Sequence, residues 1–465
     1  MTIVGVACAV VAAAFVVTEG GDDVRLYQTT GAKGFREIAT SGFTIHPYPA
    51  VRPLDIDAAR ERHCFAGLGA ALTDAAAWIL HRMPTDRRAA LLRDLFTEAG
   101  VNLGVVRLNI GASDYSTGLY CYDDTPGDVS MHDFSLARDE GYLIPMMNEI
   151  LSVRPDTFVF ASPWSPPGWM KSSGLMVGGT LRPDCQDALA NYFVAYLKGY
   201  AAHGVKIGAV TVQNETACDT EGQYPCCTYT PEAEGAFVRD SLRPAFAREG
   251  LDVKIWVHDH NYEDTNRVIR LLSESGVRSA VDGVAWHSYG KVGPEALVPL
   301  KESYGEKGFY HTEQGPSAVA TNRTETWWAR RVLGALNAGC ETFTSWNLCL
   351  DELGMPATGA HTCGGFVVVD SETREVTSSS QYRLFRHIGP FVRRGARILA
   401  VEGDRDGCDL ALFRNPDERL VLVVSCDGSF VRGKQRRRLV VKYGGKYKSL
   451  PLPAGQWSLS TLIFR

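Results

Sequence analysis

The sequence predicts a (β/α)8 barrel with an antiparallel β-sandwich domain at its side. Eight short apolar runs recur between residues 65 and 350, and most are followed by a segment of helical pattern. The runs are nearly continuous in apolar residues, as expected for parallel strands that are buried on both faces. The two ends of the chain instead alternate between apolar and polar residues, which is typical of antiparallel strands.

Each apolar run is predicted to form one strand of the barrel. The runs begin at Phe65, Gly104, Thr157, Ile207, Lys254, Asp282, Gly308 and Thr342. Helical patterns lie between them, for example at residues 85–100 and 187–204. A doubly wound sheet is the alternative, but GLGAAL at 67–72 supplies only two of the three glycines of the dinucleotide-binding fingerprint. The barrel is therefore favoured.

The β-rich ends are predicted to form one domain together. Residues 24–62 contribute its first part and residues 392–465 its second, on either side of a barrel at 63–391. Residues 1–23 are an apolar segment that resembles a signal-peptide core but lacks the usual Lys or Arg before it. We expect a secreted or extracytoplasmic protein; a β-rich first segment in a cytoplasmic protein is the alternative.

The net charge, the cysteines and the basic residues limit which classes of binding partner are expected. The net charge of the 465-residue chain is -5, which gives no reason to expect nucleic acid as a partner. Its 12 cysteines include no C-x-x-C pair and no zinc-type spacing, so most are expected to be buried small hydrophobic residues, with some disulfides if the protein is exported. A basic cluster, RGKQRRR at 432–438, fits either a solvated strand edge or peripheral contact with an anionic membrane.

Polar and aromatic side chains collect at the predicted carboxyl ends of the strands, where barrel enzymes place their chemistry. Every run after the first carries some of them. In chain order they are Arg107 and Asp114, Trp164 and Trp169, Asn214 and Glu215, His258 to His260, His287 and Tyr289, Glu313, and Trp346 and Asn347. Chance would put one or two such residues there, so the pattern predicts a functional site at this face.

Glu215 and Glu313 end the fourth and seventh strands, three strands apart on the ring, so their side chains can converge across its mouth. Two carboxylates about 5–5.5 Å apart suit retaining glycoside hydrolysis, in which one attacks carbon and the other donates a proton. Tryptophans favour this hypothesis because sugar C–H faces stack on indole planes. The alternatives are a surface ion pair for either glutamate alone and a glycosylation sequon at Asn214-Glu215-Thr216.

Eight segments from about residue 64 to 370 occur in the order typical of one enzyme family. They are FAGLGAALTDAAA, VVRLNIGASDYS, YDDTPGDVSMHDFSL, FASPWSPPGWMKSSG, YFVAYLKGYAAHGVKIGAVTVQNE, VDGVAWHSYG, EQGP and TSWNLCLDELGMP. With them the chain resembles glycoside hydrolase family 30, and within it the glucosylceramidase (acid β-glucosidase) branch. The set is highly specific, and the β-rich ends match the family's side domain.

The resemblance implies a role for each candidate residue. Glu313 would be the nucleophile and Glu215 the acid/base, with Asn214 bonded to the sugar 2-hydroxyl. Five further residues would bind the sugar or flank the nucleophile: Asp114 and Trp164 at the far hydroxyls, Trp346 as the floor, and His287 and Tyr289 beside Glu313. Because the nucleophile must be ionised, we expect Arg107 to hold the pKa of Glu313 down, and a drier setting to raise the pKa of Glu215.

Two departures from the family pattern affect these expectations. Thr216 follows the acid/base where relatives have Pro, and the fifth strand reads HDHN where relatives tend to show paired acidic residues. The second departure permits a rival hypothesis, a metal site at His258, His260 and His287, since residues two apart on a strand face the same way. It leaves the glutamates and tryptophans unexplained, so we expect no metal and no cofactor.

The resemblance implies a retaining β-glycosidase that acts on β-glucosides of the glucosylceramide type, with a β-linked glycoside or glycolipid as its partner. Alternatives within the family are a β-1,6-glucanase, a β-xylosidase or a β-fucosidase. A non-catalytic carbohydrate-binding barrel is the alternative of another class. If Asn214 lies in the pocket its sequon is a false positive, and Asn322-Arg323-Thr324 is the better glycosylation candidate in a secreted protein.

Overall fold

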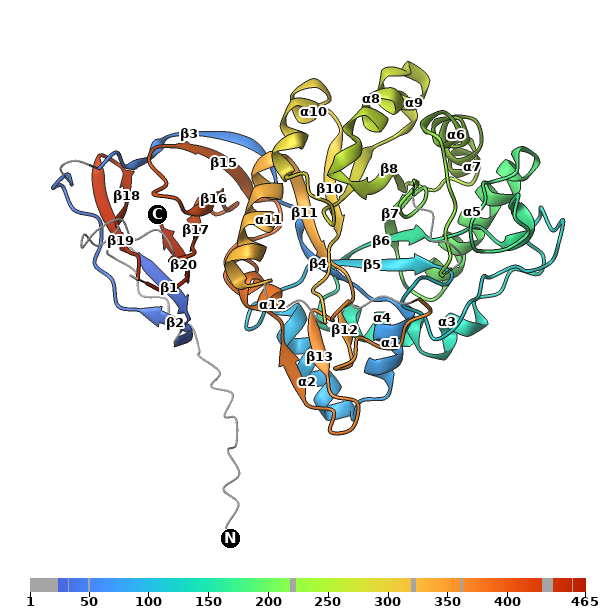
Figure 1. Cartoon of the computed structure of the whole chain (residues 1–465), viewed down its shortest axis with the longest axis horizontal. Helices are drawn as coiled ribbons and strands as arrows, with labels where there is room; N and C mark the ends of the chain where they lie inside the picture. Colours follow the sequence, from blue (N-terminus) through green and yellow to red (C-terminus); the bar gives the residue numbers. More distant parts are fainter. Residues whose placement is uncertain are drawn as a thin grey trace, which may run out of the picture.

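The computed structural model describes residues 24–465 except 32, 49–50, 218–222, 319–322, 360–362, 429–437 and 454. It has two parts, a closed barrel and a β-domain beside it (Figure 1). The apolar segment 1–23, the sequon residue Asn322 and residues 432–437 of the basic cluster lie outside the described residues. Within the described chain, we find no helix with the length and apolar character needed to span a bilayer.

The barrel consists of eight parallel strands, and all eight predicted runs form them. The strands are β4 (Gly67–Ala71), β5 (Val105–Ile110), β6 (Phe158–Pro163), β7 (Ile207–Thr211), β8 (Lys254–Asn261), β9 (Gly283–His287), β10 (Gly308–Glu313) and β11 (Cys340–Ser345). Trp256 and Tyr310 stack inside the barrel with ring centroids 3.9 Å apart, in a cluster with Phe160. Its interior is therefore a packed core rather than a pore.

Helices surround the strands. They are α1 (Asp74–His81), α2 (Thr85–Phe96), α3 (Ala137–Gly141), α4 (Leu143–Val153), η1 (Gly168–Met170), η2 (Pro183–Cys185), α5 (Gln186–Ala202), α6 (Pro231–Phe237), η3 (Val238–Leu242), α7 (Arg243–Arg248), η4 (Tyr262–Asp264), α8 (Thr265–Ser273), α9 (Ser275–Ala280), η5 (Pro294–Leu297), α10 (Val298–Ser303), α11 (Glu325–Ala338) and α12 (Ser380–Phe385). Local sequence fixes several starts: the Thr73 hydroxyl caps α1 by accepting from the Ala76 amide, and Thr324 caps α11 in the same way.

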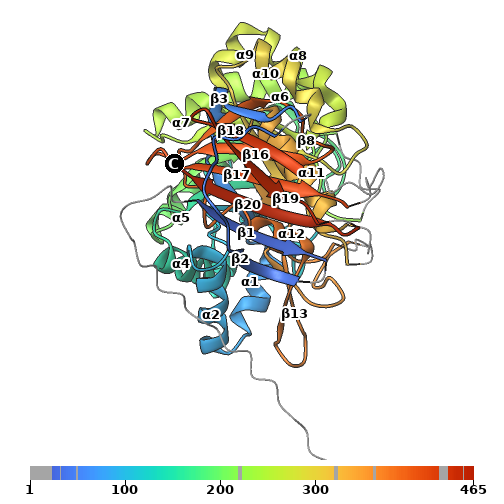
Figure 2. The same ribbon diagram turned by 90° about the vertical axis from the view of Figure 1, so that its left-hand side faces the viewer.

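A nine-stranded sheet forms the β-domain. Its strands run in the order β19 (Lys446–Pro451), β18 (Arg438–Tyr443), β3 (Leu54–Cys64), β15 (Arg397–Glu402), β16 (Asp409–Arg414), β17 (Leu420–Cys426), β20 (Ser458–Phe464), β1 (Arg25–Thr30) and β2 (Lys33–Ile38). The N-terminal strand β1 pairs with the C-terminal strand β20, and β2 pairs with β1, which confirms that both ends of the chain build this domain (Figure 2). A smaller sheet beside the barrel contains β12 (Cys349–Leu350), β13 (Val367–Val369) and β14 (Val376–Ser378).

The nine-stranded sheet departs from a purely antiparallel sandwich in one pair. Strands β18 and β3 are parallel, a direction that is open to them because no hairpin joins them. The sheet also curls over itself, since the ring of Tyr443 in β18 lies 5.2 Å from that of Phe464 in β20, although four strands separate β18 from β20.

Strand β17 is buried on both faces and links the two parts of the molecule. Val421 and Val423 belong to the core shared with the barrel, whereas Leu422 and Val424 belong to the core of the β-domain. Helix α11 lies between the barrel and the sheet, and its Asn337 amide donates to the Leu410 carbonyl of β16 at 2.8 Å (Figure 1). The β-domain is therefore packed against the barrel wall rather than tethered by a linker.

Candidate active site

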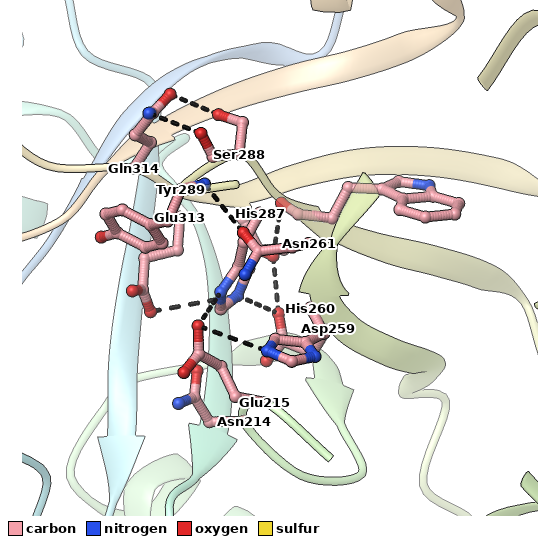
Figure 3. A network of polar contacts seen from close by, with 12 residues as sticks. Asn214, Glu215, Asp259, His260, Asn261, His287, Ser288, Tyr289, Glu313 and Gln314 are labelled. Atoms are coloured by element: carbon pink, nitrogen blue, oxygen red, sulfur yellow. Dashed lines mark hydrogen bonds and ion pairs between the residues drawn. The ribbon is translucent and has the colours of Figure 1, made fainter. Parts of the chain in front are cut away.

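The predicted site residues meet at the carboxyl ends of the barrel strands. Figure 3 shows Glu313 from β10, His287 from β9 and the residues that follow β7, with His287 between the two glutamates. One carboxylate oxygen of Glu215, one of Glu313 and one ring nitrogen of His287 all lie within 4.8 Å of one another. The two carboxylates thus face each other across a space that one glycosidic bond can occupy.

The backbone aims Glu215 into this space. Strand β7 ends at Thr211, and the chain turns so that Glu215 adopts the left-handed conformation with φ of 48°. Its amide donates to the Asp259 carbonyl at 2.9 Å, which holds the turn against the next strand. Thr216, the residue found in place of the usual Pro, donates its hydroxyl to the His258 carbonyl at 3.2 Å. A left-handed non-glycine residue at such a position is strained and is common at functional sites.

Arg107 organises the floor of the site and is fully buried. Its guanidinium donates to Glu313 Oε2 at 2.5 Å, to Asn214 Oδ1 at 2.9 Å and to Asp259 Oδ2 at 2.8 Å. The same group lies 4.8 Å from the ring centre of Trp164, which adds a cation–π contact. Because guanidinium geometry is planar and fixed, these contacts set the relative positions of three strand ends.

The expectation for the pKa of Glu313 is wrong in sign. Arg107 is in contact, as predicted, but burial raises the pKa of Glu313 above its ordinary value, and the lowering effects of His287 and Arg107 do not cancel it. Sequence spacing identified the cation but not the degree of enclosure, which depends on every loop around the site. The pKa of Tyr289 is raised well above its ordinary value by burial and by Glu313, so its hydroxyl stays protonated and donates to that carboxylate.

His287 connects the two glutamates to Asp259. Its Nδ1 lies 3.1 Å from Glu215 Oε1, and its Nε2 lies 3.0 Å from Asp259 Oδ1 and 3.9 Å from Glu313 Oε2. Burial alone would lower the pKa of His287, but the carboxylates of Glu313 and Asp259 outweigh it and raise the pKa to about 9. At neutral pH the imidazole is therefore a cation that donates from both nitrogens.

Asp259 is a central residue that the sequence analysis named only within His258 to His260 and to which it assigned no role. Its Oδ2 accepts hydrogen bonds from Arg107 and Thr211, and its Oδ1 accepts from His287 and Thr312. Burial acts to raise its pKa, but Arg107 and His287 outweigh burial and hold the pKa well below the ordinary value. Asp259 is thus an anion that orients the two cations of the site. The only signal in the sequence was an acidic residue within HDHN at a strand end.

A bulge in β8 explains why Asp259 was missed. The register between β8 and β9 shifts between His258 and His260, and both His258 and Asp259 have positive φ, 76° and 44°. The bulge turns Asp259 into the barrel, and the His258 ring packs against Trp286 with centroids 4.7 Å apart. The alternation on which the three-histidine metal hypothesis rested is therefore broken. His260 stays at the site, with Nε2 3.8 Å from Glu215 Oε1.

Among the described residues, the group whose geometry could hold a metal ion is Glu215, His287 and Glu313, not the three histidines. A metal ion there would have to displace the proton that the neighbouring carboxylates hold on His287, whose pKa they raise to about 9, so at neutral pH metal binding competes with protonation. The group fits proton transfer better than coordination.

A wall of two indoles borders the carboxylates. The rings of Trp164 and Trp346 stack with centroids 4.9 Å apart and planes at 18°. The Trp346 indole donates to the Asp114 carboxyl, whose pKa is raised well above its ordinary value by burial and by Glu313 and Glu215. The buried Oδ1 of Asp114 has no hydrogen-bond partner in the structure. This oxygen can accept a hydrogen bond from a sugar hydroxyl, while the neighbouring indole planes contact the C–H face of the sugar.

Comparison with known proteins gives a single family. The model of the glycosyl hydrolase family 30 TIM-barrel domain matches residues 65–393. The chain is 31% identical over 375 residues to an endo-1,6-β-D-glucanase of Neurospora crassa, covering 77% of each chain. It is 29% identical over 387 residues to the lysosomal acid glucosylceramidase of Mus musculus, covering 77% of this chain and 74% of the mouse protein. The solved structure of the endo-β1,6-glucanase BT3312 superposes with a TM-score of 0.84 and 26% identity, over 95% of this chain and 99% of that one.

Proposed function

Because this chain belongs to glycosyl hydrolase family 30 and is a glycoside hydrolase, we propose that it cleaves β-glucosides by a retaining double displacement, with Glu313 as nucleophile and Glu215 as acid/base. The observation that carries the proposal is the opposition of the two carboxylates, whose oxygens lie within 4.8 Å of each other. That separation supports direct attack by one carboxylate, since an inverting enzyme needs room for a water molecule between its two acids, about 6.5–9.5 Å.

In the first step Glu313 bonds to the anomeric carbon and the bond to the leaving oxygen breaks. Arg107 and Tyr289 both donate to the Glu313 carboxylate and orient it for attack. Glu215 delivers the proton to the leaving oxygen. The contact of 3.1 Å between His287 Nδ1 and Glu215 supports a proton shared between these two groups before the step.

In the second step water attacks the glycosyl–enzyme ester, and Glu215 takes the water proton. Esterification removes the charge of Glu313, which is the main carboxylate that raises the pKa of His287. The site thereby loses one negative charge, which favours ionised Glu215 as the base. Water adds to the face that the leaving group vacated, so the product keeps the β configuration.

Asn214 is suited to the sugar 2-hydroxyl because one end of its amide is already engaged. Its Oδ1 accepts from Arg107 at 2.9 Å, so the NH2 end is the one available as a donor. Asp114 supplies an acceptor for a further hydroxyl, and the two stacked tryptophans supply an apolar surface.

Two aglycones remain candidates. The similarity to the Neurospora crassa and BT3312 proteins favours a β-1,6-linked glucan, whereas the similarity to the mouse enzyme favours a glucosylceramide-like lipid. Of the two we favour the glucan, because the BT3312 structure matches nearly the full length of both chains. Either substrate fits an extracytoplasmic protein, and fractionation of the native host would test that location.

The mechanism is tested by labelling with a 2-deoxy-2-fluoro-β-glucoside followed by peptide mass spectrometry. We expect the label on Glu313; a label on another carboxylate would overturn the assignment. Proton NMR of the first product formed should show the β anomer. Hydrolysis rates on a linear β-1,6-glucan and on glucosylceramide in detergent micelles separate the aglycones.

A further inference from the structure

The β-domain contains two cysteines that occupy facing positions on neighbouring strands. Asp409 of β16 pairs with Ser425 of β17, and Leu410 pairs with Val424, in an antiparallel ladder. Cys408 directly precedes β16 and Cys426 is the last residue of β17, so the same register, continued by one residue, places them opposite each other. Both side chains are buried, and both belong to the same hydrophobic cluster as Leu410 and Val424. They therefore point to the same face of the sheet.

The hairpin turn fixes which type of pair these cysteines form. The Asn415 amide donates to the Arg419 carbonyl at 2.9 Å, so this pair at the turn is a hydrogen-bonded one. Hydrogen-bonded and non-hydrogen-bonded pairs alternate along an antiparallel ladder, so the pairs at 413, 411 and 409 are hydrogen-bonded and those at 414, 412, 410 and 408 are not. Cys408 and Cys426 thus face each other across a non-hydrogen-bonded pair.

This pair type brings side chains closest together. Its Cα atoms are about 4.5 Å apart, which lies within the range of about 4.4–6.8 Å that disulfides span. We propose that Cys408 and Cys426 are a disulfide site, and that they form a cross-strand bridge between β16 and β17 under oxidising conditions. The proposal is independent of the activity proposed for the barrel.

The bridge forms by exchange with a disulfide oxidant such as glutathione disulfide. One cysteine thiolate attacks a sulfur of the oxidant, a mixed disulfide forms, and one glutathione thiolate leaves. The second cysteine thiolate then attacks the first cysteine sulfur and releases the second glutathione. The two cysteines lose two electrons and two protons, and the oxidant becomes two glutathione thiols. Because both side chains are buried, exchange takes place as the hairpin closes during folding or when its open end separates.

The bridge would constrain the hairpin that connects the β-domain to the barrel. It closes a loop from residue 408 to residue 426, which contains the turn and all of strand β17. Closing such a loop lowers the entropy of the unfolded chain and stabilises the folded one. Strand β17 contributes to the cores of both parts of the molecule, so we expect the gain in the thermal transition of the whole chain.

The test is peptide mapping of the full-length protein after refolding in a glutathione redox buffer. Remaining thiols are alkylated, the protein is digested without reduction, and cross-linked peptides are identified by mass spectrometry. We expect a linked pair of peptides containing Cys408 and Cys426, two hydrogen masses lighter than the sum of the two thiol peptides. Alkylation of both cysteines, or linkage of either one to another cysteine, would overturn the proposal.

Single substitutions give the matched comparison. Cys408→Ser and Cys426→Ser should each abolish the cross-link and leave hydrolysis of an aryl β-glucoside unchanged. Cys185→Ser, a substitution of another buried cysteine in the barrel, should leave the cross-link intact. The oxidised wild-type protein should melt several degrees above its reduced form, and Cys408→Ser should show no such difference. Equal melting of oxidised and reduced wild type would contradict the stabilising role even where mapping finds the bridge.

Discussion

Asp259→Asn is the most informative substitution outside the two glutamates. The carboxylate accepts four hydrogen bonds, two at each oxygen, from Arg107 and Thr211 and from His287 and Thr312. An asparagine has the same shape but can accept at only one end. Its NH2 group must face either Arg107 or His287, which as cations can only donate, so one charge-assisted hydrogen bond is lost, whereas the threonine hydroxyl at the same end can turn and accept.

These contacts give an estimate of the loss in stability and in activity. A hydrogen bond to a charged group contributes about 1.5–3 kcal/mol, and the substitution also removes the buried counter-ion of two cations, so we expect a destabilisation of about 3–5 kcal/mol, the range for breaking a buried ion pair. Arg107 and His287 lose their common anchor, and displacement of reacting groups by about 1 Å costs activity on the order of 100-fold. We expect this fall in kcat/KM on an aryl β-glucoside and a lower melting temperature.

Two further variants serve as controls for Asp259→Asn. Thr312→Val removes one donor to the Asp259 carboxylate and keeps the shape of the side chain and the buried charges, so it should cost about 1.5–3 kcal/mol, less than Asp259→Asn, and keep the protein folded. Asp184→Asn breaks an ion pair that lies on the surface, and its melting temperature and kcat/KM should match those of the wild type. If Asp259→Asn retains wild-type kcat/KM and melting temperature, Asp259 does not orient the site.

Four other outcomes are expected. Glu313→Gln should lower turnover by at least about 10⁴-fold while calorimetry still detects sugar binding; normal turnover would mean that another group attacks. Trp346→Phe, which keeps an aromatic ring but removes the donor to Asp114, should raise KM about tenfold with a smaller effect on kcat, and an unchanged KM would remove Trp346 from the sugar site. The pKa of His287 is raised on folding to about 9 from an ordinary value near 6.5, so its stabilisation, about 3 kcal/mol, is complete below pH 6.5 and lost as pH rises through 9. Chemical denaturation at several pH values should show this loss in the wild type and a flatter profile in His287→Gln. Activity should be the same with and without a chelator, and inactivation would point to a metal.

The barrel could be predicted from sequence because a strand that is buried on both faces is recognisable as a short run of apolar residues. Each strand, such as β6 or β10, reads as a short apolar run, and the polar residue that ends it marks the mouth of the barrel. The convergence of Glu215 and Glu313 followed from the position of their strands on the ring. No contact between them had to be known.

The features that the sequence did not predict depend either on local backbone irregularities or on how completely the folded chain surrounds the site. The inward direction of Asp259 follows from a bulge with two left-handed residues, and a strict period of two cannot anticipate it. The parallel pairing of β18 with β3 joins segments nearly 400 residues apart, for which no turn sets the register. The raised pKa of Glu313 reflects how completely the surrounding chain excludes water, and this is a property of the assembled site.

The position of β20 has a consequence for biosynthesis. Its residues 458–464 are synthesised long after β1 and after the whole barrel, yet they supply the hydrogen-bonding partner of β1. The barrel sequence is complete before this pairing can form, so β1 remains without its β20 partner while the barrel is translated. A truncation or a protease cut that removes β20 would therefore also leave β1 and β2 without the strand that joins them to the rest of the sheet.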